Sequence, residues 1–203
     1  NWQEISPDLT KGDLSKNGGV ESRTYGTITT IAESPLKMGL IWIGTDDGNV
    51  QLTINDGDSW KLLNNNIPDN PEYCVSRIIA SNHQIETAYL SYTGRHRTDI
   101  KPYLYKTMDL GKTWTSISNN LPNEPINVIR EDVKNPNLLF VGTDRTVYVT
   151  IDGGSAWHQM KNDLPTIPIH DLALHPREND LIVGTHGRGF YIADISPLKE
   201  INN

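Results

Sequence analysis

Apolar and polar residues alternate along the chain in short runs, and no stretch keeps the 3.6-residue period of an amphipathic helix. The same order of runs occurs four times. Each repeat has a β-rich run, a polar turn, a second apolar run, and a third run in which apolar and polar residues alternate. These runs cover residues 27–32, 40–45 and 50–53, then 75–80, 87–92 and 103–107, then 126–131, 138–143 and 147–150, and finally 169–174, 181–185 and 190–193. The pattern predicts short antiparallel strands and almost no helix.

An eight-residue motif follows the third run in three of the four repeats. It reads Thr107-Met-Asp-Leu-Gly-Lys-Thr-Trp114, and it recurs at residues 53–60 and 150–157. Hydroxyl and carboxylate oxygens can bond back to loop N–H groups, glycine supplies a positive φ, and tryptophan has a large apolar surface to bury. We therefore predict three tight hairpin turns, with Trp60, Trp114 and Trp157 buried. The residues given this structural role are Thr53, Asp56, Gly57, Trp60, Thr107, Asp109, Gly111, Trp114, Thr150, Asp152, Gly154 and Trp157.

A fourth short strand is expected after each motif, starting at its tryptophan. Trp114 and Trp157 are 43 residues apart, within the range of about 40–50 residues that a four-stranded propeller blade needs. Four short antiparallel strands per repeat predict an all-β propeller. Whole blades are predicted at residues 25–70, 71–124 and 125–168, and residues 169–195 supply three strands of a last blade.

The two ends of the chain leave two arrangements open. Trp2-Gln-Glu-Ile5 matches the strand that follows a motif, and the last repeat has no motif after its third strand. Residues 1–10 could therefore complete the last blade and close a four-bladed ring. The alternative is that the chain holds part of a larger propeller, whose other blades come from the rest of a longer protein or from another copy.

The composition argues against several classes of function. The net charge is −7 and the pI about 5.3, which argues against binding of nucleic acid through phosphates. No apolar run approaches the ~20 residues of a membrane span. The single cysteine, Cys74, excludes an internal disulfide and a multi-cysteine metal site, and the histidines lack metal-ligand spacing. No cofactor or metal is expected.

The motif fits Ser/Thr-x-Asp-x-Gly-x-Thr/Ser-Trp, so the chain resembles the Asp-box (BNR-repeat) propellers, which include sialidases, xyloglucanases and sortilin-type ectodomains. Two copies depart from the pattern, with Asn55 in place of aspartate and Ala156 in place of the second hydroxyl residue. The stretches at residues 2–10, 44–48 and 184–191 look more narrowly like the later blades of large secreted bacterial glycosyl-hydrolase-like proteins. The resemblance implies a secreted, cell-surface or periplasmic location.

Strand order places the motif turns on one rim of the propeller and both long insertions, residues 11–24 and 91–101, on the opposite rim. Loops that outgrow a repeat commonly carry function. The candidate ligand-binding residues there are Arg95, His96, Arg97, His186 and Arg188, because arginine forks suit carboxylates and acidic sugars. Asp46, Asp47, Asp99, Asp144 and Arg145 are placed on the same rim.

Catalytic candidates are Glu131, Asp132 and Asp171, because a carboxylate pair can run glycoside hydrolysis. The sequence does not give their separation, and the arginine triad and Tyr–Glu pair of sialidases are not assigned. The preferred interpretation is a non-catalytic module that binds a glycan, a peptide or a partner protein through the insertion rim. The alternative is a glycoside hydrolase or a fragment of one.

Overall fold

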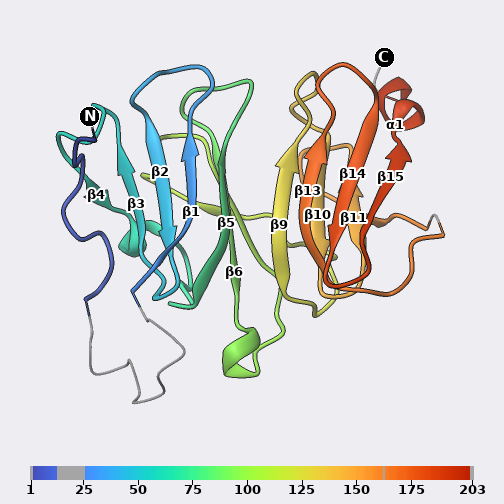
Figure 1. Ribbon diagram of the computed structural model, residues 1–203, viewed down its shortest axis with the longest axis horizontal. Helices are drawn as coiled ribbons and strands as arrows, with labels where there is room; N and C mark the ends of the chain where they lie inside the picture. The colour runs from blue at the N-terminus through green and yellow to red at the C-terminus, as the bar shows by residue number, and fades with distance from the viewer. Residues whose placement is uncertain (1, 13–25, 162, 202–203) are drawn as a thin grey trace.

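The computed structural model describes residues 2–12, 26–161 and 163–201, which form four antiparallel sheets, A to D (Figure 1). The predicted all-β fold is confirmed. Sheet A contains β1 (Ile28–Glu33), β2 (Ile41–Thr45), β3 (Val50–Thr53) and β4 (Lys61–Leu62). Sheet B contains β5 (Cys74–Ala80), β6 (Ala88–Thr93), β7 (Tyr103–Thr107) and β8 (Thr115–Ser116). Sheet C contains β9 (Ile126–Glu131), β10 (Leu139–Thr143), β11 (Val147–Thr150) and β12 (His158–Gln159), and sheet D contains β13 (Ile169–Leu174), β14 (Asp180–Thr185) and β15 (Phe190–Asp194).

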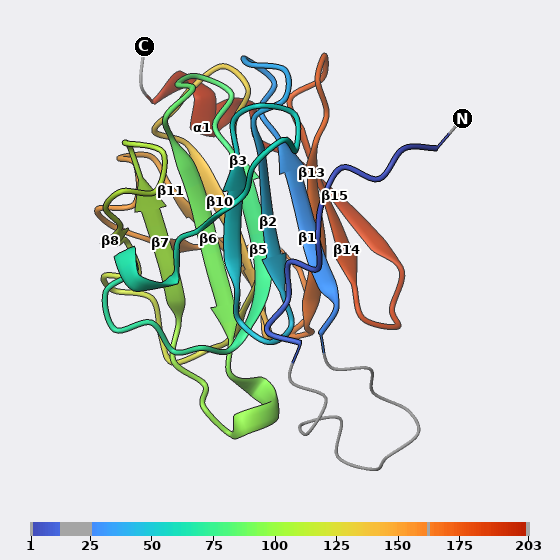
Figure 2. The same cartoon turned by 90° about the vertical axis from the view of Figure 1, so that its left-hand side faces the viewer.

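The sheets are arranged like the blades of a propeller. Within each sheet the strands follow one another in chain order, each antiparallel to its neighbour. The first strands of successive sheets pack together, β1 with β5, β5 with β9, and β9 with β13 (Figures 1 and 2). Among the described strands, β1 and β13 are not packed in this way, so the four sheets form an open arc.

Each first strand carries one unpaired bulge residue near its start. These residues are Thr29, Ser76, Asn127 and His170. A bulge re-aims a side chain and is common beside functional sites. The hydroxyls of Thr29 and Ser76 donate to the Val75 and Ile126 carbonyl oxygens of the next sheet, at 2.7 Å each. The first two bulges therefore join neighbouring blades.

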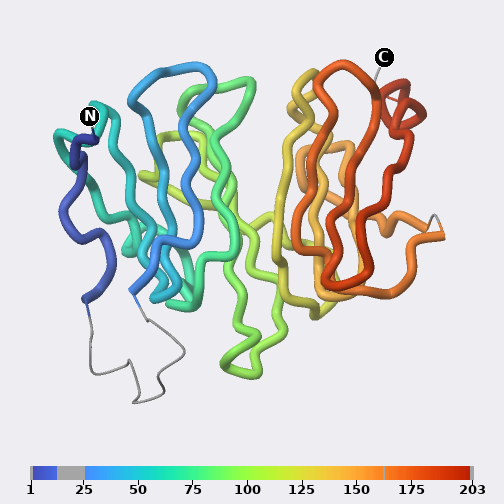
Figure 3. Tube along the Cα trace, in the orientation of Figure 1, coloured from blue at the N-terminus to red at the C-terminus, as the bar shows by residue number. Residues whose placement is uncertain are grey.

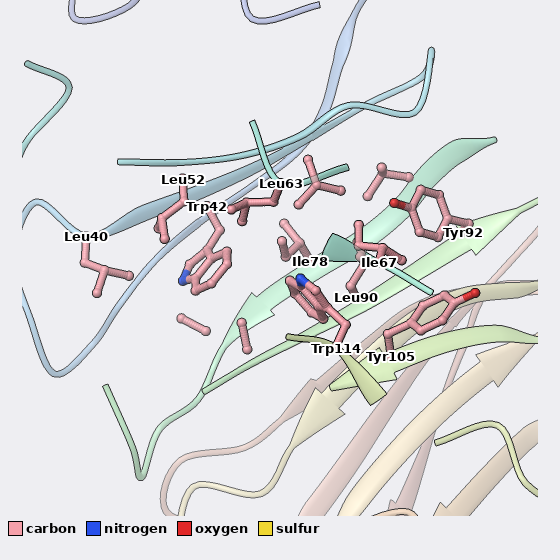
Figure 4. Close-up of a cluster of buried hydrophobic side chains, with 14 residues drawn as sticks. Leu40, Trp42, Leu52, Leu63, Ile67, Ile78, Leu90, Tyr92, Tyr105 and Trp114 are labelled. Atoms are coloured by element: carbon pink, nitrogen blue, oxygen red, sulfur yellow. The ribbon is translucent and has the colours of Figure 1, made fainter. Parts of the chain in front are cut away.

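Buried apolar side chains fill the three spaces between neighbouring sheets. Between sheets A and B, Trp42 meets Trp114 edge-on with ring centroids 6.0 Å apart, and Leu63 and Ile67 pack in the same cluster (Figure 4). A second cluster around Trp157 lies between sheets B and C, and a third around Phe140 lies between sheets C and D. Hydrophobic burial between thin blades thus stabilises the arc, as expected for a repeat fold.

The predicted hairpin turns are present. In the second copy, Asp109 Oδ1 accepts hydrogen bonds from the Thr107 hydroxyl and the Thr113 N–H, both at 2.9 Å, and the Gly111 N–H donates to the Thr107 hydroxyl at 2.9 Å. Leu110 as well as Gly111 has a positive φ, 59° and 73°. The turn therefore needs two consecutive left-handed residues, and the sequence analysis identified only the second.

One residue of the first turn was assigned wrongly. Asn55, not Asp56, accepts from the Thr53 hydroxyl at 2.9 Å and from the Ser59 N–H at 3.1 Å. Asp56 is the residue with positive φ (61°), equivalent to Leu110. The asparagine amide oxygen has the same reach as a carboxylate oxygen, so the turn closes without the aspartate.

The tryptophan prediction is right for two residues and wrong for the third. Trp114 and Trp157 are 5% and 3% exposed, whereas Trp60 is only half-buried. Trp60 belongs to sheet A, which has no described sheet packed on the side away from sheet B. Its indole N–H instead donates to the carbonyl of Ile5 at 3.1 Å.

The proposed closure of sheet D by residues 2–5 is not observed. Sheet D has three strands, and residues 2–5 pair with no described strand. They lie against sheet A, at the opposite end of the arc from β15 (Figure 3). After β15 the chain forms the short helix α1 (Ser196–Glu200), which the sequence analysis did not predict. In the described part of the chain, no helix is long and apolar enough to cross a bilayer.

Candidate binding rim

The insertion rim is the edge of the arc formed by the loops β2–β3, β6–β7, β10–β11 and β14–β15, opposite the hairpin turns. The β6–β7 loop extends furthest and contains the short 3-10 helix η3 (Arg95–Arg97), which projects from the lower edge of the molecule in Figure 1. Asp99 fixes the shape of this loop, because it accepts from the Tyr103 and Tyr73 hydroxyls at 2.7 and 3.2 Å. Of the other predicted insertion, residues 13–24 lie outside the described residues.

Arg95 is held by two side chains of sheet C. Its guanidinium forms a two-pronged ion pair with Asp144 of the β10–β11 loop, with Nε to Oδ2 at 3.1 Å. The same guanidinium lies 3.4 Å from the amide oxygen of Asn127, whose Nδ2 donates to Asp144 Oδ1 at 2.9 Å. The bulge residue of sheet C thus holds Asp144 in position for Arg95. All three side chains are only partly buried, so a ligand can compete for their hydrogen bonds.

Two histidines stack beside this ion pair. The rings of His170, the bulge residue of sheet D, and His186, from the β14–β15 loop, lie 4.8 Å apart at 23°. Burial lowers the pKa of His170, and the neighbouring His186 and Arg95 lower it further when they carry positive charge. The rim cluster, defined here as Arg95, Asn127, Asp144, His170 and His186, therefore joins loops of sheets B, C and D.

Below the rim cluster, three charged residues of the first strands meet. Asp171 Oδ1 accepts from Arg130 at 2.6 Å and from Arg77 at 3.1 Å. Asp171 is the more exposed partner, with 58% of its side chain accessible, against 26% for Arg77 and 23% for Arg130. The carboxylate bridges sheets B, C and D and neutralises two clustered arginines.

The other two carboxylates proposed for catalysis are buried at the end of β9. Glu131 is 3% exposed and accepts from the Ser81 and Tyr89 hydroxyls, both at 2.9 Å, and from the Asn82 N–H at 2.6 Å. Asp132 has no exposed surface and pairs with Lys199 of α1 at 3.0 Å. Both oxygens of Glu131 are thus bonded to protein donors in place of a substrate or a water. These contacts tie sheet C to sheet B and to α1.

Asp171 lies near the start of β13, whereas Glu131 and Asp132 lie at the end of β9. β9 and β13 run in the same direction through the arc, and Glu131 is the last residue of β9 whereas Asp171 is the third of β13. The structure therefore does not bring the three proposed catalytic carboxylates together at one cleft.

The remaining rim residues divide into exposed and structural ones. His96, Arg97 and Arg188 are exposed, and Arg145 lies 3.9 Å from Glu124. Asp46 accepts from the N–H groups of Gly26 and Thr27, and Asp47 from the Thr45 hydroxyl and the Lys11 N–H, so both hold the chain that enters sheet A. Among the described residues, no three His, Cys, Asp or Glu side chains are placed to hold a metal ion.

Sequence reasoning missed Asn127 and His170. Both are bulge residues, and a signal existed: each directly follows an isoleucine or valine near the start of its strand, as Thr29 and Ser76 do in sheets A and B. A polar residue at one fixed place in all four repeats marks a shared backbone feature.

Comparison with known proteins identifies the fold. The family model Sortilin-Vps10 (Sortilin, neurotensin receptor 3) matches residues 102–194. Among solved structures, the Niastella koreensis GH74 enzyme matches 86% of this chain at 14% identity (TM-score 0.65), using 29% of that enzyme. The GH74 xyloglucanase of Xanthomonas campestris matches 85% at 12% identity (TM-score 0.66), using 30% of that enzyme.

A third match is the extracellular domain assigned to a hybrid two-component system, BT4673, of B. thetaiotaomicron. It matches 87% of this chain at 17% identity (TM-score 0.63), using 22% of that protein. The chain thus spans less than a third of the length of these proteins. No curated protein sequence matches it. The resemblance to sortilin and xyloglucanase-like Asp-box propellers is confirmed, and at these identities it establishes the fold.

Proposed function

We propose that this propeller is a non-catalytic module that binds a polysaccharide through its rim cluster. The observation that carries the proposal is the contrast between the two groups of polar residues. The carboxylates Glu131 and Asp132 are buried and bonded within the protein. Arg95, Asn127 and Asp144 are partly exposed where the β6–β7 loop meets sheet C.

Sugar hydroxyls both donate and accept hydrogen bonds, and the rim cluster offers both kinds of partner. The guanidinium of Arg95 donates, the carboxylate of Asp144 accepts, and the amide of Asn127 does both. With His170 and His186 of sheet D, the rim cluster covers three sheets, so its residues spread along the rim, as an extended chain of sugars requires. The GH74 xyloglucanase match supports xyloglucan as the first polysaccharide to test. A polysaccharide ligand is consistent with a secreted or cell-surface location, which the extracellular BT4673 match also supports.

Isothermal titration with xyloglucan oligosaccharides tests the proposal, and acidic oligosaccharides are the second probe because of Arg95, Arg97 and Arg188. The expected result is binding that Arg95→Ala abolishes and that Lys37→Ala leaves intact, because Lys37 is an exposed residue of the β1–β2 loop, on the rim of the hairpin turns. Wild-type protein that binds neither class of sugar would refute it.

The second candidate function is glycoside hydrolysis, favoured by one observation. Asp171 keeps 58% of its side chain exposed and lies on a first strand, facing the axis of the arc with Arg77 and Arg130. A reducing-sugar assay separates the two functions. Hydrolysis that Asp171→Asn removes, while Asp171→Asn keeps its melting temperature, would establish the enzyme and exclude the non-catalytic module.

A further inference from the structure

The fourth strand is anchored in the same way in sheets A, B and C. The residue three positions after each tryptophan donates its N–H to a carbonyl near the start of the third strand: Leu63 to Val50, Ile117 to Leu104 and Met160 to Val147, at 2.9–3.0 Å. The register repeats as well, since Lys61, Thr115 and His158 each lie opposite the residue two positions after that carbonyl: Leu52, Lys106 and Val149.

The tryptophan at the start of the fourth strand fills the space toward the preceding sheet. Trp114 packs in the cluster with Leu63 and Ile67 (Figure 4), and Trp157 packs with Ile117 and Leu121. In both cases the partners are the end of the previous fourth strand and the chain that follows it. The interface between two blades is therefore complete only when this indole is present.

Sheet D has no such strand, and a pocket lies where its tryptophan would pack. The pocket has a volume of about 350 Å³ and is lined by Met160 and Leu164, which correspond to Ile117 and Leu121, and by Tyr191 and Ala193 of β15. It is the unfilled part of the established interface between sheets C and D. Beside it, the outer face of β15 exposes Phe190 (71%) and Ile192 (59%), so the apolar surface continues onto the side where another blade would pack.

The chain contains one segment that fits this pocket. Trp2-Gln-Glu-Ile5-Ser6 repeats the tryptophan, isoleucine and serine of Trp114-Thr-Ser-Ile117-Ser118 at the same spacing. Ile5 also makes the contacts of Ile117. The carbonyl of Ile5 accepts from the Trp60 indole as that of Ile117 does from Trp157, at 3.1 and 2.7 Å, and Gly57 and Gly154 pack against these two residues.

Residues 2–6 therefore already lie against sheet A as the fourth strand of a preceding blade would. Trp2 is fully exposed there. Within one molecule the segment and β15 lie at opposite ends of the longest dimension (Figure 1), so this segment does not reach the pocket of its own copy.

We propose that the pocket beside β15 receives Trp2 from a second copy of this chain, with residues 2–6 of that copy forming the fourth strand of sheet D. By the register of the other three sheets, Gln3 lies opposite Ile192 and Glu4 opposite Tyr191, and the N–H of Ile5 donates to the Phe190 carbonyl. Sheet A of the incoming copy then covers Phe190 and Ile192. The contact is heterologous, joining the end of one arc to the beginning of the next.

Sedimentation velocity over a wide range of protein concentration tests the association. Wild-type protein is expected to form dimers or larger species, and Trp2→Ala to weaken the association more than about tenfold, as loss of a central tryptophan at an interface does. Trp2 makes no packing contact within its own copy, so the variant should keep the wild-type melting temperature. Met108→Ala is the matched control, because it removes another exposed apolar side chain (61%), in the hairpin turn of sheet B at neither end of the arc. A monomeric wild-type protein at every concentration, or equal association of Trp2→Ala and wild type, would overturn the proposal.

Disulfide trapping tests the register and the source of the strand. A mixture of the single variants Gln3→Cys and Ile192→Cys should yield a mixed disulfide dimer, while Gln3→Cys mixed with Lys37→Cys should not. Burial raises the pKa of the native Cys74 thiol to about 11, which keeps it slow to react at neutral pH. A disulfide that forms only in the Gln3→Cys/Ile192→Cys double variant, and then within one chain, would show ring closure and refute the second copy.

Discussion

The indole N–H of Trp157 donates to the carbonyl oxygen of Ile117 across the boundary between sheets C and B, at 2.7 Å. The equivalent nitrogen of Trp114 is buried without a hydrogen-bond partner among the described residues. Two tryptophans at the same position of the repeat, both almost fully buried, thus differ in one polar contact. The difference allows the contribution of packing to be separated from that of the hydrogen bond.

Trp157→Phe should lower the free energy of unfolding by about 1 kcal/mol more than Trp114→Phe. Both substitutions remove similar apolar volume, but only the first leaves a buried carbonyl without its donor. Urea unfolding followed by circular dichroism gives the two values. Equal losses would show that the Trp157 hydrogen bond adds nothing to packing.

Full truncation extends the comparison to the third tryptophan. Trp114→Ala should cost about 3–5 kcal/mol as a large-to-small change in a core. Trp60→Ala should cost clearly less, because Trp60 is half-buried and its indole N–H bonds to the exposed segment around Ile5. Unfolding midpoints in urea rank the two variants, and a Trp60→Ala loss as large as that of Trp114→Ala would contradict the half-buried position.

Asp109→Ala should lower the free energy of unfolding by about 1 kcal/mol, the usual net value of a turn hydrogen bond. Asp109→Asn should lower it much less, because Asn55 closes the equivalent turn of sheet A with the same bonds. Polysaccharide binding should be unchanged in both variants, since the hairpin turns lie on the rim opposite the rim cluster. Lost binding at an unchanged melting temperature would contradict a purely structural role.

The turn aspartates should also make the free energy of unfolding depend on pH in the acid range. A hydrogen bond from the Thr150 hydroxyl, followed by one from the Ala156 N–H, holds the pKa of Asp152 below its ordinary value. A carboxyl whose folded pKa is lower than its unfolded pKa, about 3.9, stabilises the fold above that pH and loses this contribution as the pH falls through the folded value. Melting temperatures between pH 6 and pH 2 should therefore fall less steeply for Asp152→Asn than for the wild type. Parallel curves would exclude Asp152 from the acid response.

Glu131→Gln tests whether the buried carboxylate is structural. The substitution keeps the shape but places an amide N–H₂ where the Asn82 N–H or the two hydroxyls donate, so at least about 2 kcal/mol of stability should be lost. The loss should appear in urea unfolding without any change in sugar binding by the folded fraction. Wild-type stability with altered binding would move Glu131 into the functional site.

The repeated motif allowed the fold to be predicted from the sequence. Trp114, Trp157 and the glycines beside them recur because each blade needs the same turn and the same indole, so their positions reveal strand order and both rims. Trp60 was misjudged because burial depends on a neighbouring sheet, and the motif is identical whether or not that sheet is present. Leu110 was missed because a leucine gives no local sign that the turn forces it to a positive φ.

The candidate site could be predicted from the sequence only in part. Arg95 and His186 were found because they stand in loops that depart from the repeat. Their partners Asn127 and His170 were not, because they lie inside strands and reach the rim through bulges, which are a property of strand pairing. Glu131 and Asp132 were proposed for catalysis because a carboxylate near an inner strand has the same sequence appearance whether it is buried or open to a substrate.

Arg95→Ala should abolish polysaccharide binding, and the reason lies in the arrangement of the rim cluster. Arg95 and Asn127 both donate to Asp144. Removal of Arg95 therefore takes away a donor to the ligand and also leaves the acceptor, Asp144, held by Asn127 alone. Arg97→Ala is the matched control, since Arg97 belongs to the same short helix and is also exposed but forms no hydrogen bond or ion pair with Asp144 or Asn127 in the described part of the chain. Arg95→Lys should recover little of the affinity, because an ammonium does not reproduce the two-pronged contact of a guanidinium.

Titration calorimetry of the wild type and the three variants measures these effects, with melting temperatures as the check on folding. If Arg97→Ala loses binding and Arg95→Ala keeps it, the ligand contacts the outer side of η3 and the rim cluster only supports the loop.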